Sequence, residues 1–591
     1  MRWNVRTAEP ADLNRLQEIP NLLPSVARLL VLRGIRDPES AERFLNPSLA
    51  HLHSPYLMRG MSAAVERLCA AIAHQEKILI YGDYDADGTM AVVVLMTAIG
   101  MCGGLADFHV PHRIRDGYGM RDEVIEQAAA QGVRLIISVD TGIRAFAAAD
   151  AARRAGVDLI VTDHHLPQSE GVPDALAVLN PNQPGCDYPC KFLCGAGVAF
   201  KLAQALLEKS QPDRKDMPRL LASFMKVVAI ATIADAVPLT GENRVFAKLG
   251  LDGLRAPKNA GLQALLDAAQ LGYGEKAGAR KFTAGDVAFR LAPRLNAAGR
   301  MDVAQTVIEL FMAKDVARTR ELAERLNQLN ADRQEEERRI MSAIEARIEE
   351  SPELRDAYCM VIDGDGWHRG VIGITATRVV ERYNRPALVI TRDGDEAHGS
   401  GRSISAFHLL NALESCPKLF TRFGGHAHAV GFALPSDRIP ELRASVDAFA
   451  RTQLTAADFE PILRIDGELT LDEVTPDLFN AVKQLEPFGM GNPEPVFAVH
   501  NARLLLPPRL LKDAHVKFKL APPQKTGKFV PGFEAVGWRM AELLAQQQLL
   551  AGDTVDVAFT LDHNDHPEFG GLQLCLSDFV KTSVQAASTT A

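Results

Sequence analysis

The chain has 591 residues, a formal net charge of −9 and 8 cysteines. A chain of this length is expected to form three or more domains, since one domain usually takes about 150 residues. The acidic balance argues against wholesale electrostatic binding of nucleic acid and leaves room for a local basic channel. So few cysteines in so long a chain do not indicate a disulfide framework.

The N-terminus, MRWNVRTAEP, lacks the apolar core of a signal peptide, and no apolar run is expected to reach the ~18 residues of a membrane span. The sequence therefore predicts a cytoplasmic protein without membrane contact. Residues 1–60 are expected to form a small helical extension, with an apolar helix in SVARLLVLRG. No residue pattern in this extension indicates chemistry.

The stretch KILIYGDYDADGT, residues 77–89, is the one around which the chain is organised. Its apolar start predicts a parallel strand buried on both faces, and the apolar segment after Gly88 predicts a helix. Three carboxylates, Asp83, Asp85 and Asp87, fall in the turn between them. So much like charge is unfavourable unless a cation neutralises it, which indicates a divalent-metal site. A solvated acidic turn and carboxylates that cap the helix are the two alternatives.

Four further apolar segments alternate with helical patterns: LADFHVP, RLIISVD, VDLIVTD and ALAVLN. The alternation predicts a parallel sheet, whose ligands gather beyond the carboxyl ends of its strands. Asp140 closes the second of these segments and Asp163 closes the third, followed by His164 and His165. Asp235 closes the apolar helical run FMKVVAIATIAD. We therefore expect these groups to meet at one edge of the sheet.

Each of these groups also has an ordinary explanation. Asp140 could be a strand-ending turn residue and Asp235 a helix-ending one, while adjacent histidines are often merely solvated. Their convergence favours metal, because carboxylates suit Mg²⁺ and Mn²⁺ and imidazole shifts the preference toward Mn²⁺. The set is large enough for two ions ~3.5 to 4 Å apart, a pair that activates water and stabilises the leaving oxygen of a phosphoryl group.

Together these motifs resemble the DHH phosphoesterase superfamily, which is named for the triplet Asp163-His164-His165. The resemblance rests on GDYDADG, on the turn Asp140-Thr141-Gly142, on the triplet and on ATIADAVPL. The length and the later motifs are similar to those of its bacterial branch of single-strand-specific 5′ to 3′ DNA exonucleases. The resemblance covers nearly the whole chain after the N-terminal extension.

The resemblance implies two Mn²⁺ or Mg²⁺ ions as cofactors. Five positions match its metal ligands: Asp85, Asp87, Asp140, His164 and Asp235. It further implies that His165 touches the scissile phosphate or assists the water held by the metal, with Asp83 close by as the second candidate catalytic residue. In the pyrophosphatase branch a histidine stands four residues before the first aspartate of the Asp-x-Asp pair, where this chain has Tyr81.

Cationic motifs are candidates for binding substrate. VPHRIRDGYG places Arg113, Arg115 and Tyr118 just past a strand end, where arginine can clamp a phosphate and tyrosine can stack on a base. An exposed basic loop is the alternative. RLAPRLNAAGRM resembles a motif near the nucleic-acid path of the exonuclease branch, and it offers three candidates: Arg294, Asn296 and Arg300.

Three cysteines recur every four residues in CDYPCKFLCGAG: Cys186, Cys190 and Cys194. A zinc or iron–sulfur site is one interpretation, but the spacing is not that of the usual Cys-x-x-Cys knuckle. Buried or unpaired thiols are the interpretation we favour.

A long helix is expected over residues 313–352, which contain neither glycine nor an interior proline and carry isoleucines four apart. This helix would join the first domain, residues 61–312, to a second α/β domain, residues 353–456. The second domain contains GSGRSI and FGGHAHAVGF, whose glycines let backbone amides approach phosphate oxygens. In the family this domain binds phosphate across the cleft, which implies five substrate-binding residues: Ser400, Arg402, Gly424, Gly425 and His426.

Residues 457–582 are short alternating strands divided by proline and glycine, which predicts a small closed or partly closed β-barrel. EPFGMGNPEPVF resembles the entry to an OB-fold in the exonuclease branch. Such folds bind single strands with aromatic residues and lysines. The candidates are Lys512, His515, Lys517, Phe518 and Trp538, although a place in the core is the interpretation we favour for Phe518 and Trp538. Residues 583–591 are predicted to be a disordered tail.

The sequence thus predicts an α/β protein: a parallel-sheet DHH domain joined by a long helix to a second α/β phosphate-binding domain, followed by an all-β OB-fold domain. The predicted activity is that of a 5′ to 3′ exonuclease on single-stranded DNA, releasing 5′-mononucleotides in DNA repair and recombination. One alternative is a DHH hydrolase of cyclic dinucleotides, nano-RNA or pyrophosphate, which the bridging helix and barrel disfavour. The other is a non-catalytic replication scaffold, which the intact carboxylates and histidines disfavour. Expected partners of the monomeric chain are single-stranded DNA, a helicase and a single-strand-binding protein.

Overall fold

The structure is a computed structural model of the chain, and it describes residues 1–117, 119–278, 281–523, 532–564 and 570–582. The predicted tail, residues 583–591, and Tyr118 lie outside these ranges. The chain divides into two compact units, Ser48–Glu460 and the pair Met1–Pro47 with Pro461–Ala591. Most of the N-terminal extension expected over residues 1–60 therefore folds with the C-terminal β-domain.

A parallel sheet forms the first part of the unit Ser48–Glu460, with the strand order β3-β2-β4-β5-β6. Its strands are β2 (Lys77–Tyr81), β3 (Leu105–His109), β4 (Val133–Val139), β5 (Asp158–Thr162) and β6 (Ala177–Leu179). The first four strands are parallel because a helix connects each to the next. The carboxyl ends of β2, β4 and β5 consequently lie side by side.

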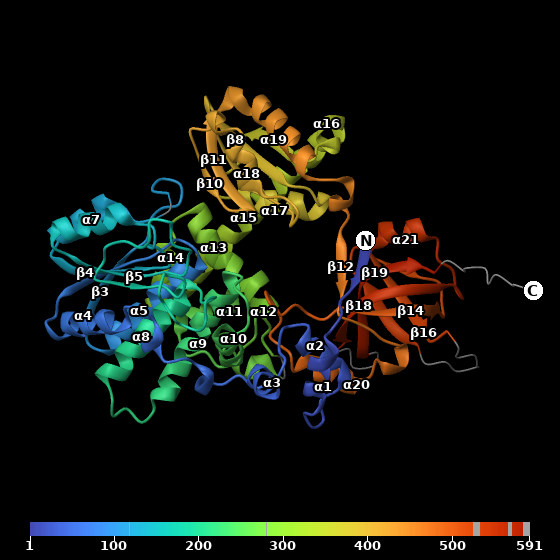
Figure 1. The fold of residues 1–591 in the computed structure, drawn as a ribbon, viewed down its shortest axis with the longest axis horizontal. Helices are drawn as coiled ribbons and strands as arrows, with labels where there is room; N and C mark the ends of the chain where they lie inside the picture. Colours follow the sequence, from blue (N-terminus) through green and yellow to red (C-terminus); the bar gives the residue numbers. More distant parts are fainter. Residues whose placement is uncertain (118, 279–280, 524–531, 565–569, 583–591) are drawn as a thin grey trace, which may run out of the picture. The chain divides into compact units, whose positions relative to one another are not determined.

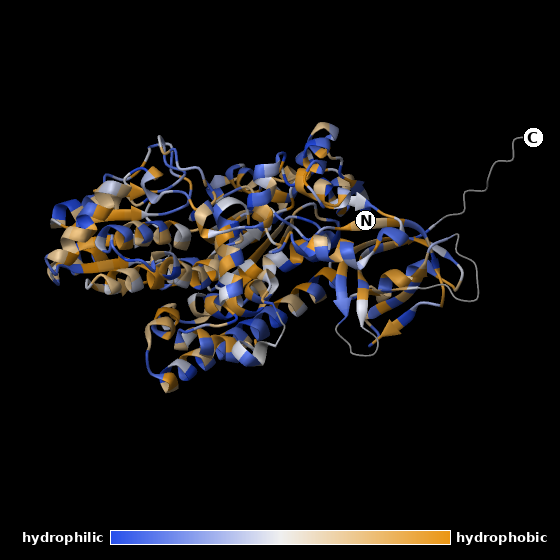
Figure 2. Cartoon of the chain, turned by 90° about the horizontal axis from the view of Figure 1, so that it is seen from below, coloured by the Kyte–Doolittle hydropathy of each residue, from blue (hydrophilic) through white to orange (hydrophobic). Residues whose placement is uncertain are grey.

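Helices cover both faces of this sheet (Figure 1): α4 (Met61–Ala73), α5 (Ala86–Met101) and α8 (Gly195–Ser210) on one, α6 (Asp122–Ala130) and α7 (Phe146–Ala155) on the other. In β2, Ile78 and Ile80 pack with the first group, whereas Leu79 and Tyr81 pack with the second. Alternation across a sheet covered on both faces explains why the strand is apolar at every position. Figure 2 shows hydrophobic and hydrophilic residues interspersed along the chain, and α6 and α7 bury only part of their residues, whereas α5 and α8 are buried over most of their length.

Among the described residues, one helix is long and apolar enough to cross a membrane by length and composition, α9 (Met217–Ala234). The expectation that no such run exists was therefore wrong. In the structure 56% of its apolar window is buried, and the helix packs against α5, α8 and α10 (Gly241–Gly253). This is the environment of a core helix, and the last residue of its apolar run leads directly into Asp235.

The predicted long helix is α15 (Val316–Glu350). Leu322 and Leu326 near its start are buried in the core of the parallel-sheet domain, whereas Ile340 and Ile344 near its end are buried in the core of the second domain. One continuous helix thus contributes to two hydrophobic cores within the same unit.

The second domain is a mixed sheet with the order β10-β11-β9-β8-β7. Its strands are β7 (Met360–Asp365), β8 (Ala387–Asp393), β9 (Glu396–Arg402), β10 (Arg422–Gly425) and β11 (Ala429–Pro435), covered by α17 (Ile372–Tyr383), α18 (Leu409–Glu414) and α19 (Ile439–Gln453). Strand β9 ends with the GSGR motif, and β10 ends with the glycines of FGGH. Since β11 lies between these two strands, both motifs belong to one sheet.

The other unit contains a seven-stranded sheet in the order β13-β14-β18-β19-β17-β16-β15, which an additional β14–β16 pairing closes. The strands are β13 (Gly467–Glu468), β14 (Phe497–Leu504), β15 (Arg509–Leu511), β16 (His515–Ala521), β17 (Phe533–Gly537), β18 (Thr554–Asn564) and β19 (Gly571–Lys581). Closure removes most of the exposed strand edge. Phe518 is a core residue of this barrel, whereas Trp538 is 57% exposed.

The N-terminal residues are part of this unit by both hydrogen bonding and packing. Strand β1 (Arg2–Val5) pairs in parallel with β12 (Ile462–Ile465). Leu16, Leu29 and Phe44 come from three helices, α1 (Pro10–Gln17), α2 (Pro24–Val31) and α3 (Pro38–Leu45). All three side chains are buried in the barrel's hydrophobic core. The first and last parts of the chain therefore fold together.

Candidate metal centre

Acidic and imidazole side chains gather beyond the carboxyl ends of β2, β4 and β5. Three groups of three residues are found here, and within each group the ligand atoms lie within 4.8 Å of one another: Asp83 with Asp85 and Asp140, Asp87 with His164 and Asp235, and Asp140 with His164 and His165. The seven residues come from four separate segments of the chain. The structure thus brings together every residue that the sequence predicted as a metal ligand or catalytic group.

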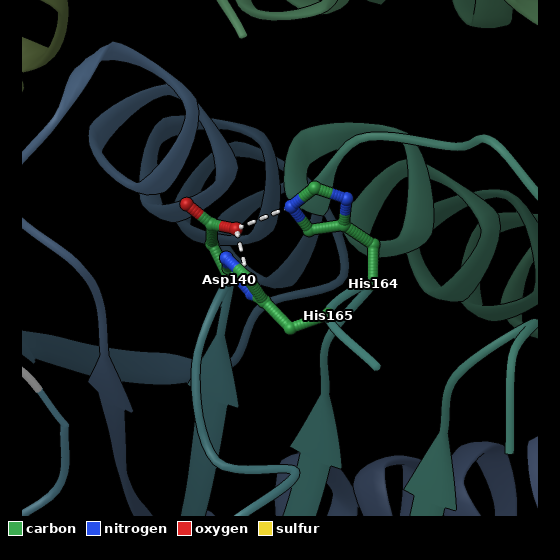
Figure 3. Close-up of side chains that lie close together, drawn as sticks. All are labelled: Asp140, His164 and His165. Carbon is green, nitrogen blue, oxygen red and sulfur yellow. Dashed lines mark ion pairs between the residues drawn. The ribbon is translucent and has the colours of Figure 1, made fainter. Parts of the chain in front are cut away.

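His164 is at the centre of this arrangement. Its Nε2 lies 3.2 Å from Oδ1 of Asp140, 3.7 Å from Oδ2 of Asp235 and 3.8 Å from Oδ2 of Asp87. Figure 3 shows one carboxylate oxygen of Asp140, Oδ1, facing both the ring of His164 and the ring of His165. Burial lowers the pKa of His164 despite the charge of Asp87, and a neutral imidazole is the form that binds metal.

Local backbone geometry explains the spacing of the aspartates in GDYDADG. Oδ1 of Asp85 accepts hydrogen bonds from the backbone N–H groups of Asp87 and Gly88, so Asp85 caps α5. A Cβ atom on Gly88 would lie 2.7 Å from the carbonyl oxygen of Asp83, so only glycine fits there. The capping interpretation is therefore correct for one oxygen of Asp85, and its other oxygen remains for a cation.

Asp87 and Asp140 meet at the N-terminus of α8. The two carboxylate oxygens of Asp87 accept the backbone N–H groups of Gly195 and Ala196 at 2.6 and 2.8 Å. A Cβ atom on Gly195 would lie 2.5 Å from Cβ of Asp140, and Asp140 itself has a φ of 59°. A left-handed aspartate is uncommon and needs support from its surroundings, which the close-packed helix end provides.

The electrostatics of this cluster fit a cation. Burial and neighbouring carboxylates raise the pKa values of Asp83, Asp87 and Asp140, and raise that of Asp235 to about 9. Oδ1 of Asp140 is buried and has no hydrogen-bond partner among the described residues. Oxygen donors with an imidazole are the ligand set of Mn²⁺ and Mg²⁺ rather than of softer metals. The residues present therefore fit the two ions that the sequence predicted.

Asp163 was part of the recognised triplet but was not predicted as a site residue. Its Oδ1 accepts hydrogen bonds from the backbone N–H groups of His164 and His165 and lies 2.7 Å from Nδ1 of His165. Burial lowers the pKa of His165, but the hydrogen bond and charge of Asp163 outweigh burial and raise it to about 9. Asp163 therefore orients the histidine pair. The position of Asp163 at the end of an apolar strand is the feature of the sequence that could have indicated this role.

Three predicted arginines lie together beside the carboxylates. Arg113 lies over the ring of Tyr84, 4.9 Å from its centroid. Burial and the neighbouring charge of Arg113 lower the pKa of Arg300 to about 10. The same two causes lower the pKa of Arg402. Nη1 of Arg402 donates to Oγ of Ser400 and to the carbonyl oxygen of Gly401. Guanidinium groups gathered this closely form a site for an anion.

Two other predicted substrate ligands contact the protein instead. Oδ1 of Asn296 accepts the backbone N–H of Ala86 at 2.8 Å, which holds the start of α5. Arg294 donates to the carbonyl oxygens of Arg290 and Ala268 and to Oδ1 of Asn327. The motif RLNAAGR thus supports the GDYDADG loop, and we do not propose Arg294 or Asn296 as substrate ligands.

The glycine motif of the second domain faces the DHH triplet. A cavity of about 760 Å³ is lined by His164 and His165 on one side and by Gly425 and His426 on the other. Gly424 precedes them at the end of β10. His426 is exposed, so its imidazole is accessible from this cavity.

All three cysteines of CDYPCKFLCGAG are free thiols, with Cys186 and Cys194 buried and Cys190 partly buried. Within the described residues no metal-ligand cluster includes a cysteine. The thiol interpretation thus describes this segment better than a zinc or iron–sulfur site.

Comparisons with known proteins agree with this organisation. The chain matches the DHH family N-terminal domain over residues 77–232, the DHHA1 domain over residues 356–452 and the RecJ OB domain over residues 465–578. The single-stranded-DNA-specific exonuclease RecJ of Bacillus subtilis is 36% identical over 581 residues, which cover 98% of this chain and 70% of that protein.

Two crystal structures of RecJ from Thermus thermophilus are also similar. The complex with Mn²⁺ has a TM-score of 0.81 at 29% identity, covering 98% of this chain and 80% of that one. The complex with Mg²⁺ has a TM-score of 0.75 at 27% identity, covering 98% and 79%. The predicted fold is confirmed, as is the prediction that Mn²⁺ or Mg²⁺ is the cofactor.

A parallel sheet with a carboxylate–histidine centre at its edge, joined by a long helix to a glycine-rich domain, defines a metal-dependent phosphoesterase of the DHH class. The OB domain and the length of the match then narrow the assignment. The chain belongs to the RecJ family of single-stranded-DNA-specific exonucleases.

Proposed function

We propose that the protein hydrolyses single-stranded DNA from its 5′ end and releases 5′-mononucleotides. The observation that carries this proposal is the convergence of Asp87, Asp140 and Asp235 on Nε2 of His164. Two divalent cations bound by this centre and by Asp83 and Asp85 would activate a water and stabilise the leaving oxygen of a phosphodiester. Membership in the RecJ family supports the substrate class.

The arginine cluster supports the 5′ polarity. Arg113 and Arg402, with Ser400, would hold the terminal 5′-phosphate, since paired guanidinium groups bind phosphate bidentately. The next phosphodiester along the strand would then lie at the carboxylates. Its hydrolysis separates one nucleotide with a 5′-phosphate and a 3′-hydroxyl from a shortened strand with a new 5′-phosphate. That new end can enter the same arginine cluster, so the reaction repeats in one direction.

His165 has a distinct part in this proposal. Its Nδ1 faces Asp163, so its Nε2 is the atom available to the substrate. The raised pKa keeps both ring nitrogens protonated at neutral pH, so Nε2 carries a proton as well as Nδ1. We assign to that Nε2–H a hydrogen bond to a non-bridging oxygen of the scissile phosphate, which strengthens as negative charge develops there. His426 and the amides at Gly424 and Gly425 would contact phosphate from the second domain.

The barrel would hold the strand outside the catalytic centre. Trp538 is exposed, and its ring lies 4.9 Å from that of His515 in an edge-on arrangement. Lys512 is exposed, whereas Lys517 pairs with Glu534 at 2.9 Å. An exposed aromatic ring beside cationic side chains is how OB-folds bind single strands without sequence preference. Phe518, which is buried, is excluded as a contact.

We further propose a cytoplasmic, monomeric protein whose single strand is supplied by a helicase and a single-strand-binding protein, in repair and recombination. A single strand must be separated from its duplex before such an enzyme can act, which is the reason for these partners. Tests of binding against purified candidates of both classes would examine this part of the proposal.

The direct test uses oligonucleotides labelled at either end, single-stranded or duplex, with Mn²⁺. We expect a 5′ label to be released as a mononucleotide at once and a 3′-labelled strand to shorten progressively, with duplex ends resistant. Release of a 3′ label first, or equal attack on duplex, would contradict the proposal. Cleavage of pyrophosphate or cyclic dinucleotides with no action on DNA would favour the alternative hydrolase.

A further inference from the structure

One face of the cavity beside His165 is formed by residues that have no role in the proposed function. Besides the two histidines and the second-domain glycine motif, it is lined by the turn from Thr141 to Ala145, by Leu166 and by Lys191 and Phe192. Arg113, Arg300, Ser400 and Arg402, which form the proposed site for the terminal phosphate, do not line it. The cavity and the arginine cluster are therefore two separate places around one catalytic centre.

Two large apolar side chains are exposed in this cavity. Leu166 is 62% exposed and Phe192 is 59% exposed, although both lie within a few residues of buried parts of the site. Phe192 is not a core residue, since Leu193 and Cys194 immediately after it are completely buried while its own ring is not. An exposed aromatic ring at the wall of a cavity is available to stack on a ligand.

Hydrogen bonds fix the loop that carries Phe192 to the catalytic histidines. Nδ2 of Asn182 donates to the carbonyl oxygen of His164 at 2.9 Å and to that of Lys191 at 3.1 Å. The ammonium group of Lys191 donates to the carbonyl oxygens of Pro181 and Cys186. Phe192 therefore follows a residue that is linked to His164 through the side chain of Asn182. A ring on so constrained a backbone can bind a ligand at little cost in conformational entropy.

Two cationic side chains, those of Arg144 and Lys191, lie beside this apolar face. Nε of Arg144 donates to the carbonyl oxygen of Leu166, which holds the guanidinium beside the loop after His165. Among the described residues Arg144 has no acidic partner, and its side chain is exposed. Lys191 and His426 line the same cavity. An apolar ring with cationic neighbours is complementary to a nucleobase on a phosphodiester backbone.

We infer that Phe192 is a stacking face for the nucleobase on the 3′ side of the scissile phosphate, with Arg144 contacting the following phosphate. This inference rests on the proposed function. If the terminal 5′-phosphate lies on Arg113 and Arg402 and the scissile phosphate lies at the carboxylates, the strand leaves the centre past His165. The cavity lined by Phe192 is the space that it then enters. The second nucleotide of the substrate is therefore the one that this site binds.

The test combines a protein variant with a modified substrate. Single-stranded oligonucleotides carry one abasic residue at the first, second, third or fourth position from the 5′ end. For the unmodified protein we expect the abasic residue at the second position to raise KM about 10-fold for release of the first nucleotide, and more than at the fourth position. Phe192→Ala should raise KM on the intact strand by a similar factor. The variant should show no further penalty for the abasic residue at the second position.

Two controls separate stacking from other effects. Phe192→Trp should retain the preference for a base at the second position, because indole also stacks. Tyr56→Ala removes another partly exposed aromatic ring, 46% exposed and outside this cavity, and should behave as the unmodified protein. Quenching of 2-aminopurine placed at the second position, measured with Ca²⁺ in place of Mn²⁺, reports the same contact without turnover.

The outcomes are distinguishable. If the unmodified protein releases 5′-nucleotides but Phe192→Ala keeps the full penalty for the abasic residue, the inference is wrong and the proposed function stands. Additive effects of the two changes, or a penalty that moves to another position, would also overturn it. If the unmodified protein releases no nucleotide from any strand, both the proposed function and this inference fall.

Discussion

Oδ1 of Asp163 lies 2.7 Å from Nδ1 of His165 and also accepts the backbone N–H groups of His164 and His165. A single carboxylate oxygen thus fixes the ring of one histidine and the backbone of both. Its Oδ2 accepts the backbone N–H of Ile143, so both carboxylate oxygens are hydrogen-bonded within the protein. The first residue of the triplet therefore positions the other two and has no oxygen left for substrate.

The role of Asp163 can be tested with Asp163→Asn, which keeps the shape and removes the charge. The amide cannot hold the His165 ring in its protonated form, so we expect kcat to fall about 10- to 100-fold. The pH at which kcat declines on the alkaline side should move down, because the pKa of His165 falls without the carboxylate. Rates across pH 6 to 10 would measure both. An unchanged profile with a lower kcat would mean that Asp163 is only structural.

The carboxylate cluster predicts how stability depends on pH and metal. Burial raises the pKa values of Asp140 and Asp235 in the folded chain, so the metal-free folded state binds more protons than the unfolded state. The stability that these groups contribute to the metal-free protein is present at low pH and is lost as pH rises from the ordinary aspartate pKa of 3.8 towards about 9.

Added Mn²⁺ should reverse this loss, since metal binds deprotonated carboxylates. We expect Mn²⁺ to raise Tm more at pH 8 than at pH 5.5, measured by thermal shift after chelation and readdition. Asp140→Asn should raise the Tm of the metal-free protein at pH 8 and abolish the Mn²⁺ effect. Equal Mn²⁺ shifts at both pH values would contradict a metal site built from these carboxylates.

The arginine cluster predicts a preference for a 5′-phosphate. Arg402→Ala removes one of the proposed phosphate clamps, so KM for a 5′-phosphorylated strand should rise about 10- to 100-fold, as for loss of charge-assisted hydrogen bonds. KM for a strand with a 5′-hydroxyl should change little. Arg438→Ala is a matched control, because Arg438 in the same domain is partly exposed and pairs with Glu441. Equal losses on both strands would place Arg402 elsewhere along the substrate.

The barrel contains a histidine that makes its stability depend on pH. His500 lies between Glu468 and Asp556, 3.1 and 3.0 Å away. Burial lowers the pKa of His500, but the hydrogen bonds and charges of the two carboxylates outweigh burial and raise it. The stabilisation is therefore present below the unfolded pKa of about 6.5 and is lost as pH rises through the higher folded value.

His500→Gln tests this dependence locally. At pH 6 the variant should exchange the amide hydrogens of β14 and β18 faster than the unmodified protein, and at pH 9 the two should be alike. Hydrogen exchange resolved by mass spectrometry reads these strands separately from the rest of the chain. Faster exchange at pH 9 alone would reverse the sign and contradict the ion pairs.

The packing of the N-terminus changes how the barrel's role should be tested. Deleting only the residues after 459 would uncover Leu16, Leu29 and Phe44, which are buried in the barrel core. We therefore expect that variant to aggregate. Deleting both Met1–Pro47 and Pro461–Ala591 should give a soluble protein that binds long single strands more weakly but turns over a saturating short oligonucleotide at a similar rate. Equal affinity for long strands before and after the double deletion would exclude the barrel as a binding site.

The sequence by itself determined the parallel sheet and which carboxylate and imidazole groups meet at its edge. A strand such as β2 is apolar at every position because both of its faces are covered, and Asp140 and Asp163 each follow such a strand. Strand ends in a parallel sheet share one edge, so local pattern was enough to predict that these groups meet. The long helix was equally visible, since its isoleucines are four residues apart.

Only the tertiary structure decided what depends on distant partners. It showed that Asn296 accepts a backbone N–H at the start of α5 and that Asp87 accepts one at the start of α8. It also showed that the first residues of the chain are part of the barrel core. It further showed that Phe518 is buried whereas Trp538 is exposed. A side chain's hydrogen-bond partners and burial are set by segments that lie far away in the sequence. Local composition and periodicity carry no information about them.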